Sequence, residues 1–339
     1  MKLRGPARDL VVGNTRLRVR RTALLGAERV AGLGGRDLEG VIGQLLGTVY
    51  GRHLDPAAAD RRSAALIAVT AARRELLRAV LAVHRGPAQD VVGPLLSPYD
   101  VADVLTLLRG AAHDLPDDDV LDAVDAVGAL TPAVARHVVA DDPEVVVPRL
   151  VAARLPDQDT ARVLPAAWER YLRHGDLAEL ELTVAREAAH AQDRRLADVG
   201  PLAQPVRRHL AAGRDATNVL TALRLRGDVP MAQAALLPPG ELDERALLAL
   251  AVDGRPGPSL PAAWRARLER RPDPADLPAL AQELQELRLT TAVARYRSGD
   301  PLGADIAVGY VAAVETEARA LRQLLTTAPS APGMTGRAA

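Results

Sequence analysis

The sequence predicts an all-α protein made of three similar helical bundles. Ala, Leu, Arg and Glu, which favour helices, fill much of the chain, whereas aromatic residues make up only 2% and Phe is absent. The chain has 339 residues, more than the roughly 250 to 300 at which one hydrophobic core stops growing. Three stretches also share one helical pattern, which is typical of repeat proteins. We therefore expect several domains whose cores are packed by aliphatic side chains.

The repeated pattern lies towards the end of each third of the chain. Superposing Asp100 on Asp215 places Asp103 on Asn218, and the letters VLT that follow match without a gap. The three copies are residues 97–110 (SPYDVADVLTLLRG), 213–227 (GRDATNVLTALRLRG) and 299–325 (GDPLGADIAVGYVAAVETEARALRQLL).

The first two copies have the form of one buried helix face. Apolar residues recur at positions i, i+3, i+4 and i+7, as in an amphipathic helix. Asp100 and Asp215 precede these faces, where a carboxylate meets free backbone N–H groups and the positive end of the helix dipole. Arg109 and Arg224 follow them, where a cation is favoured. We predict that both acids begin helices and both arginines end them.

The first predicted domain, residues 1–112, holds three helices before the first repeat. Leu10, Leu17 and Leu24 lie at heptad spacing on one face of the first helix. Asp55 and Pro56 resemble an N-cap followed by proline at the first helical position, which opens the third helix. The expected helices are residues 8–30, 37–53 and 55–84.

The other predicted domains are residues 113–228 and 229–326. The second begins with an acidic helix, gains a long helix at residues 166–199 and ends in the second repeat. The third contains a stretch rich in Pro and Gly, a helix at residues 277–297 and the third repeat. Residues 327–339 are rich in Pro, Gly and Ala, so we expect a disordered tail.

Charge and composition exclude several classes of function. The formal net charge is zero, so no overall positive field attracts the chain to nucleic acid or to an anionic membrane. No Cys is present, which excludes disulfides and fits a reducing compartment. No apolar run approaches the roughly 20 residues that span a bilayer, and the first residues lack a signal-peptide stretch. We expect a cytoplasmic protein that does not bind nucleic acid and contacts a membrane only through partners.

The common enzyme motifs are absent from the sequence. It has no phosphate-binding G-x-x-x-x-G-K-[ST] loop, no H-E-x-x-H pair and no G-x-S-x-G turn. We therefore expect no catalytic residues, no cofactor and no metal site.

One acidic cluster supports a rival hypothesis. Asp118, Asp119 and Asp122 match the DDxxD pattern with which helical isoprenoid synthases hold Mg²⁺ against a pyrophosphate. The alternative is that these acids form the first turn of a helix and stabilise its dipole. A second acidic motif is not visible, and a chain poor in aromatic residues is badly suited to line a carbocation pocket.

Five segments, in order along the chain, resemble the C subunit of the bacterial and archaeal V/A-type rotary ATPases, which is the counterpart of the d subunit of eukaryotic V-ATPases. They are GNTRLRVRRTALL (13–25), GQLLGTVYGRHL (43–54), the first two repeats, and DPLGADIAVGYVAAVETEARALRQLL (300–325). The resemblance implies a three-domain helical funnel with pseudo-threefold symmetry. It also implies a non-catalytic rotor part that sits on the cytoplasmic face of the proteolipid ring, at the plasma membrane. The partners would be this ring and the central stalk, whose foot enters the funnel.

The family motifs also map onto single residues here. The family Asn of the repeat is Asp103 in the first copy, and the third copy has no Asn, with Ala318 and Arg319 near that point. The motif residues carried over by the resemblance are Asn14, Arg16, Arg18, Arg20, Thr48, Tyr50, Tyr310, Glu315 and Glu317.

Two interpretations of the arginine cluster and of the whole chain stay open. The cluster comprises Arg16, Arg18, Arg20 and Arg21. These four residues spread around more than one helix face, so they form either a solvated surface or contacts to acidic groups of the stalk or ring. The chain as a whole is either the rotor subunit or a helical scaffold outside the motor.

Overall fold

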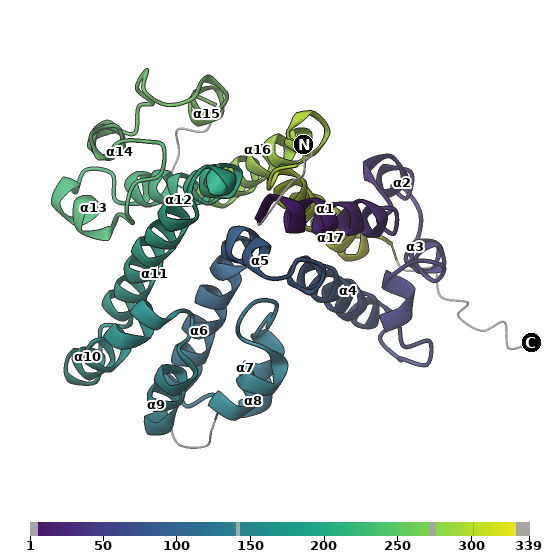
Figure 1. The fold of residues 1–339 in the computed structure, drawn as a ribbon, viewed down its shortest axis with the longest axis horizontal. Helices are drawn as coiled ribbons and strands as arrows, with labels where there is room; N and C mark the ends of the chain where they lie inside the picture. The colour runs from purple at the N-terminus through teal and green to yellow at the C-terminus, as the bar shows by residue number, and fades with distance from the viewer. Residues whose placement is uncertain (1–5, 140–142, 271–275, 301, 330–339) are drawn as a thin grey trace, which may run out of the picture.

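The computed structural model describes residues 6–139, 143–270, 276–300 and 302–329. Within these ranges the chain forms helices joined by turns, with no strand, which confirms the all-α prediction. Figure 1 shows three groups of helices that spread from a centre where α5, α12 and α16 meet.

The first group joins both ends of the chain. It holds the long helix α4 and, beside it, the last helix α17, which also packs against α1 and α16 (Figure 1). The bounds of the group are α1 Pro6–Arg21, α2 Ala27–Ala31, α3 Leu38–Leu45, the 3₁₀ turn η1 Tyr50–His53, α4 Arg61–Val83 and α17 Asp305–Thr327.

The second and third groups follow in chain order between α4 and α17. The second contains α5 Pro87–Val92, η2 Gly93–Leu95, α6 Ser97–Ala112, α7 Asp117–Ala123, α8 Pro132–Val138, α9 Pro143–Ala153, α10 Gln158–His174 and α11 Leu177–Val199. The third contains η3 Gly200–Ala203, α12 Gln204–Arg224, α13 Val229–Ala235, α14 Glu244–Asp253, α15 Ala262–Leu268 and α16 Leu277–Ser298.

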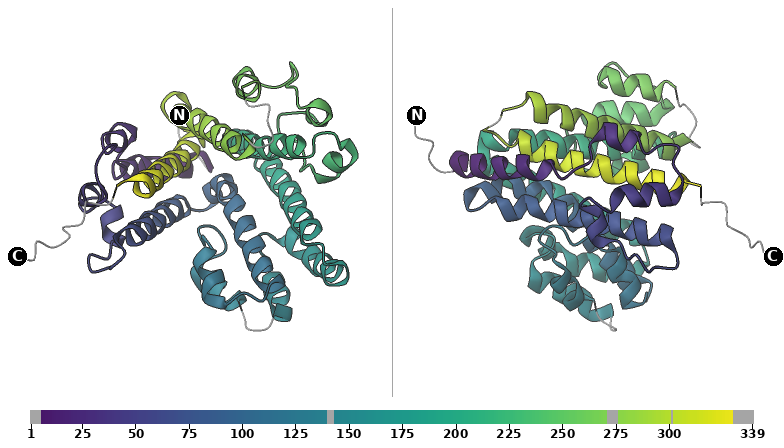
Figure 2. Two further views of the ribbon diagram at one scale, coloured as in Figure 1. Left: turned by 180° about the vertical axis from the view of Figure 1, so that it is seen from behind. Right: turned by 90° about the vertical axis from the view of Figure 1, so that its right-hand side faces the viewer.

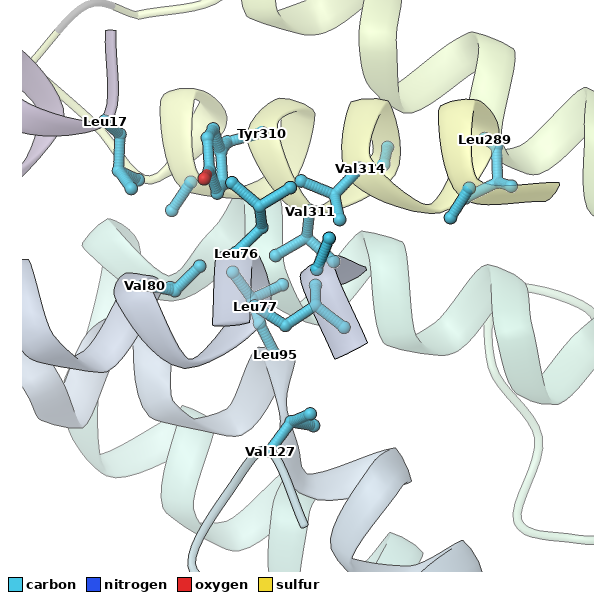
Figure 3. Close-up of a cluster of buried hydrophobic side chains, with 14 of the residues drawn as sticks. Leu17, Leu76, Leu77, Val80, Leu95, Val127, Leu289, Tyr310, Val311 and Val314 are labelled. Carbon is cyan, nitrogen blue, oxygen red and sulfur yellow. The ribbon is translucent and has the colours of Figure 1, made fainter. Parts of the chain in front are cut away.

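Buried aliphatic side chains form three clusters. The largest draws residues from both ends of the chain and also from α5, α11, α12 and α16, so it spans all three groups. The second cluster lies within residues 104–184 and the third within residues 219–284. Figure 3 shows Leu77 of α4 and Val311 of α17 meeting in the first cluster, with Leu17 of α1 beside Tyr310. The domain division at residues 112, 228 and 326 follows chain order and stays a prediction.

Two of the predicted helices are in fact pairs of shorter ones. The helix expected over residues 8–30 breaks after α1 and resumes at α2, with Gly26 in a left-handed conformation at φ 80°. The helix expected from residue 166 breaks at Gly175, also left-handed, between α10 and α11. Glycine adopts such angles without the clash that a Cβ atom would bring.

Other helix starts also differ from the predictions. The helix expected from Asp55 begins later, at α4, where the Asp60 carboxylate accepts from the Ser63 amide at 3.0 Å. Asp55 instead accepts from the Ala57 amide in a turn. The 37–53 segment stops as an α-helix at the end of α3, because the Thr48 hydroxyl donates to the Leu45 carbonyl and closes a turn.

No single helix in the described part of the chain is both long and apolar enough to cross a membrane. The bent pair formed by residues Pro87–Leu95 and Ser97–Ala112 passes the same test together, by length and composition only. Residues 330–339 of the expected disordered tail lie outside the described residues. Within its described part, Thr327 ends α17 and Ala328 is buried, so the order of the chain extends slightly further than predicted.

Helix α1 sits so close to the end of α4 that one position tolerates only glycine. A Cβ atom on Gly13 would clash with Cδ2 of His84, whose buried ring is fixed by a 2.7 Å contact between Nδ1 and the Val80 carbonyl. We expect Gly13→Ala to lower the free energy of unfolding by about 1–3 kcal/mol, because the ring has no space to move. Denaturant titration followed by circular dichroism measures this change.

Gly43→Ala is the matched control. Gly43 lies inside α3 with nothing within 4 Å of an added Cβ atom, so alanine should raise stability by up to about 1 kcal/mol. Equal effects of the two substitutions would contradict the close contact of α1 with His84.

Candidate functional site: a central cavity and the loops pinned around it

A cavity lies near the centre of the molecule, where the three groups meet. Its volume is about 900 Å³, and α5, α6, α11, α12 and α16 supply most of its wall. Small residues such as Ala188, Gly213 and Ala281 line parts of the wall, together with the arginines Arg195, Arg214 and Arg288. The arrangement leaves space for a guest that carries polar groups.

The first repeat helix holds the loop between α7 and α8. Asp103 accepts from the amides of Asp125 and Ala126 at 2.7 and 2.8 Å. Asp100, one turn earlier, accepts from the amides of Ala129 and Leu130 at 3.0 and 2.9 Å. Both carboxylates are buried. Asp100 lies in the first turn of α6, as predicted, but both carboxylates accept from this distant loop and not from the start of their own helix.

The second repeat helix holds the loop between α13 and α14 in the same way. Asp215 accepts from the amides of Gly240 and Glu241 at 2.9 and 2.7 Å, and from Leu242 at 3.2 Å. The Asn218 amide pairs with both backbone groups of Leu237. Asp215 lies in the middle of α12, which begins at Gln204, so the prediction that it begins a helix is wrong.

The pinned loops carry a second part of the repeat that the sequence analysis missed. In each loop a glycine reaches the pinning aspartate, because a Cβ atom on Gly128 or Gly240 would clash with the carboxylate oxygens of Asp100 or Asp215. Three residues after each glycine, Thr131 or Asp243 caps the next helix. The sequence signal is G-x-L-[TD], placed 28 and 25 residues after the two acids.

The third repeat helix pins a loop from the opposite end of the chain. Glu317 of α17 accepts from the amides of Leu25 and Gly26 at 2.9 and 2.7 Å, which fixes the break between α1 and α2. The buried Tyr50 hydroxyl donates to the same carboxylate at 2.7 Å. The structure thus brings together Tyr50 and Glu317, two residues that the family resemblance carried over.

Glu315, two residues earlier, faces a different network. It accepts from Tyr99 at 2.6 Å and pairs at 2.8 Å with Arg73, which also pairs with Asp125 at 2.8 Å. Arg73 is buried and its guanidinium lies over the Tyr99 ring. This network links α4, α6, α17 and the first pinned loop. The sequence analysis missed Arg73, although it stands among apolar residues on a helix face.

Burial raises the proton affinity of the pinning carboxylates. Burial raises the pKa of Asp100 from 3.8 to about 6, although the amides of Ala129 and Leu130 oppose the change. Burial likewise raises the pKa values of Asp103 and Asp215. Because Asp100 binds its proton more tightly in the folded chain, its ionisation lowers the free energy of unfolding as the pH rises from 3.8 to about 6.

The other predicted residues lie at separate places. Asn14 is buried, donates to the Gly303 carbonyl at 2.9 Å and adjoins His84. The Thr48 hydroxyl supports the turn before Tyr50. Arg109 and Arg224 lie in the last turns of α6 and α12, as predicted, and Arg109 also pairs with Glu181 at 2.5 Å.

The remaining members of the set are exposed arginines and one buried tyrosine. Arg16, Arg18 and Arg20 are exposed on α1, so the structure gathers none of them into the central cavity. Tyr310 is fully buried, and its hydroxyl has no hydrogen-bond partner within the described residues.

The acidic DDxxD cluster forms the exposed side of a short helix. Asp117 and its two successors occupy the first turn of α7, and Asp118, Asp119 and Asp122 all face solvent. Across the described ranges, no group of three or more acidic or histidine side chains is placed to hold a metal ion. The geometry favours the helix-dipole interpretation of these acids.

Comparison with known proteins identifies a family that covers most of this chain. The model of the family described as "ATP synthase (C/AC39) subunit" matches residues 13–327, which is nearly the whole chain. The chain belongs to the ATP synthase (C/AC39) subunit family. No curated protein matches it.

Membership gives the C/AC39 chain a general role. The family supplies a non-catalytic subunit of V/A-type ATPases, which are membrane-associated complexes. The match covers all three repeat helices and the loops that they pin. The resemblance found in the five sequence segments is thereby confirmed.

The Asn218 pair offers a test of the pinning geometry. In Asn218→Asp, a carboxylate replaces the Nδ2 group that donates to the Leu237 carbonyl at 3.1 Å. Two oxygens then face each other in a buried site, so we expect a loss of about 1–3 kcal/mol at neutral pH. Protonation restores a donor, which places the folded pKa above the unfolded value. The deficit relative to wild type should therefore shrink as the pH falls, as measured by denaturant titration from pH ~7 to ~4.

Asn218→Ala is the control, because it removes both bonds and cannot titrate. Its deficit relative to wild type should stay constant over the same pH range. A pH-independent deficit for Asn218→Asp would show that residue 218 does not face the Leu237 carbonyl.

Proposed function

We propose that this protein couples the central stalk of a V/A-type ATPase or ATP synthase to the membrane proteolipid ring. It transmits torque between the stalk and the ring, which carries protons or sodium ions, and it takes no part in catalysis. Its place is the cytoplasmic face of the plasma membrane, where it contacts the membrane only through these partners. The match to the C/AC39 family over residues 13–327 carries the proposal.

The central cavity supports the same role. It opens among helices of all three groups, and its volume of about 900 Å³ equals about two turns of a helix some 10 Å across. A stalk foot held there contacts every group at once. A torque applied at this point therefore reaches all parts of the protein.

The pinned loops support torque transmission. Each repeat helix holds a distant loop by two or three hydrogen bonds to a buried carboxylate or amide. Hydrogen bonds to a charged group contribute about 1.5–3 kcal/mol each, so the helices and loops of a group move as one body. A stiff protein transmits torque between its partners because little of the rotation is lost in deforming the protein itself.

Photo-cross-linking tests whether the cavity receives the stalk. Thr217 is exposed on the cavity wall, and we would replace it by p-benzoylphenylalanine in the native host and irradiate its membranes. We expect adducts to stalk subunits, identified by mass spectrometry, because a guest in the cavity lies within contact distance.

Thr291 is the matched control for this experiment. It is exposed on α16, lies outside the cavity and donates to the carbonyl four residues earlier, as Thr217 does. It should give few stalk adducts. Equal labelling from both positions, or no adduct from residue 217 in an intact motor, would refute cavity docking and favour a helical scaffold outside the motor.

Charge reversal tests the exposed arginines of α1. Arg16→Glu with Arg18→Glu should reduce recovery of stalk and ring subunits with the tagged protein, if these exposed side chains meet acidic partner groups. Circular dichroism of the isolated variant should stay unchanged because neither side chain is buried. Affinity purification from native membranes in mild detergent measures the recovery.

The control variant has the same change in charge at two exposed arginines outside α1. Arg136 and Arg173 are exposed on α8 and α10, and reversing both should leave assembly intact. Unchanged recovery for the Arg16 and Arg18 variant would assign those arginines to a solvated surface.

A further inference from the structure

We propose that an arginine-rich face of α17 and α16, beside the central cavity, binds an acidic segment of the central stalk. This inference rests on the proposed function and adds the chemistry of the partner. The face is defined by Arg288 of α16 together with Arg319 and Arg322 of α17.

The face is built by helix periodicity on α17. Glu315, Arg319 and Arg322 stand at positions i, i+4 and i+7, which lie along one side of a helix. That side meets α4 and α6, because Glu315 contacts Arg73 and Tyr99. In the left view of Figure 2, α17, α4, α6 and α16 lie around the same central region.

The nearby carboxylates already have partners. Glu315 accepts from Tyr99 and pairs with Arg73, and Asp125 pairs with both Arg73 and Arg74. Each of these acids is therefore engaged by cations of α4. Neither acid forms an ion pair with any of the three arginines of the face.

Those three arginines have only neutral partners or none. Arg288 donates to Gln285 at 2.8 Å and contacts Nε2 of His209 at 3.3 Å, both uncharged acceptors. The guanidinium groups of Arg319 and Arg322 make no hydrogen bond or ion pair with any residue in the described ranges. A partner that carries carboxylates fits this surplus of donors.

The cations also destabilise one another in the isolated chain. Burial is the main cause that lowers the pKa of Arg288; Arg319 adds to the decrease, and Tyr99 and Glu315 oppose it. Burial likewise lowers the pKa of Arg322, with Arg73 and Arg319 as further causes, while Glu315 and Asp125 oppose the decrease. An incoming carboxylate relieves this repulsion, so binding gains strength from charges that are unbalanced in the free protein.

One member of the face lies on the wall of a cavity that has room for the partner. Arg288 lies on the cavity wall. Arg214, on the same wall, is only 10% exposed, and its Nε atom is buried without a hydrogen-bond partner among the described residues. A guest carboxylate at this end of the cavity meets donors from α12 and α16.

The experiment uses the scarcity of lysine in this chain, where Lys2 is the single lysine. Arg319→Lys with Arg322→Lys keeps both charges and introduces amines that a carbodiimide joins directly to carboxylates in contact. The tagged complex from native membranes is treated with the carbodiimide, and mass spectrometry identifies the acid joined to residue 319 or 322. We expect Asp, Glu or a terminal carboxylate of a stalk subunit.

Arg208→Lys with Arg245→Lys is the control, since both residues are exposed and lie outside the cavity wall. It should give no stalk adduct. A second variant, Arg319→Gln with Arg322→Gln, should reduce stalk recovery about tenfold while the unfolding temperature of the free protein stays the same or rises. A lower unfolding temperature would assign these arginines to packing.

The outcomes separate the two proposals. If the stalk copurifies but residues 319 and 322 join only Glu315, a ring subunit or nothing, the inference fails and the coupling role stands. If stalk recovery is sensitive to inorganic phosphate while no carboxylate adduct forms, the face binds phosphate and the inference also fails. If wild type recovers no motor subunit, the proposed function itself fails, and the inference with it.

Discussion

The structure depends on buried carboxylates that hold the backbone of distant loops. A loop that runs through the interior carries N–H groups that need acceptors, and an unsatisfied one costs about 1–3 kcal/mol. Asp103, Asp215 and Glu317 each supply oxygens to two or more such groups. The carboxylates are costly to bury, as the raised pKa of Asp215 shows, and the amides offset that cost. The buried carboxylate and the loop amides therefore stabilise each other, because each offsets the cost of burying the other.

The absence of phenylalanine makes these pins more important. A core of Leu, Val and Ala packs by contact area and fixes position less sharply than large rings do. Close approach of small residues adds some definition, because a Cβ atom on Gly110 would meet Val120 at 2.6 Å and one on Gly309 would clash with Tyr296. The hydrogen bonds from buried side chains to loop backbone groups are directional, so they fix the position of each loop in a way that the aliphatic clusters do not. The combination gives a defined arrangement with an aromatic content of only 2%.

Sequence patterns predicted helices, which depend on neighbouring residues, and missed contacts between segments that are far apart in the chain. Composition and helical periodicity predicted the all-α class. The alignment of Asp103 with Asn218 matched two residues that each accept a hydrogen bond from a loop amide. Periodicity does not show where a helix begins when no breaker is present, so α12 starts 11 residues before Asp215. The partner of Glu317 lies 291 residues away, at Gly26, and no local pattern reports a contact across that distance. The resemblance pointed to Glu317, but only the structure shows what it binds.

Helix α17 is where the ends of the chain and two of the groups are joined. Glu315 and Glu317, two residues apart, hold different neighbours: the first engages Arg73, which binds the loop of the second group, and the second fixes the break after α1. A rotation of the first group against the second breaks the contact between Arg73 and Asp125. Glu315 and Glu317 are therefore both occupied by other residues of this chain. The guanidinium groups of Arg319 and Arg322, in contrast, have no acceptor among the described residues. The contacts that stiffen the protein thus leave the guanidinium groups of Arg319 and Arg322 without an ion pair in the described ranges, and an acidic segment of the stalk is the partner proposed for them.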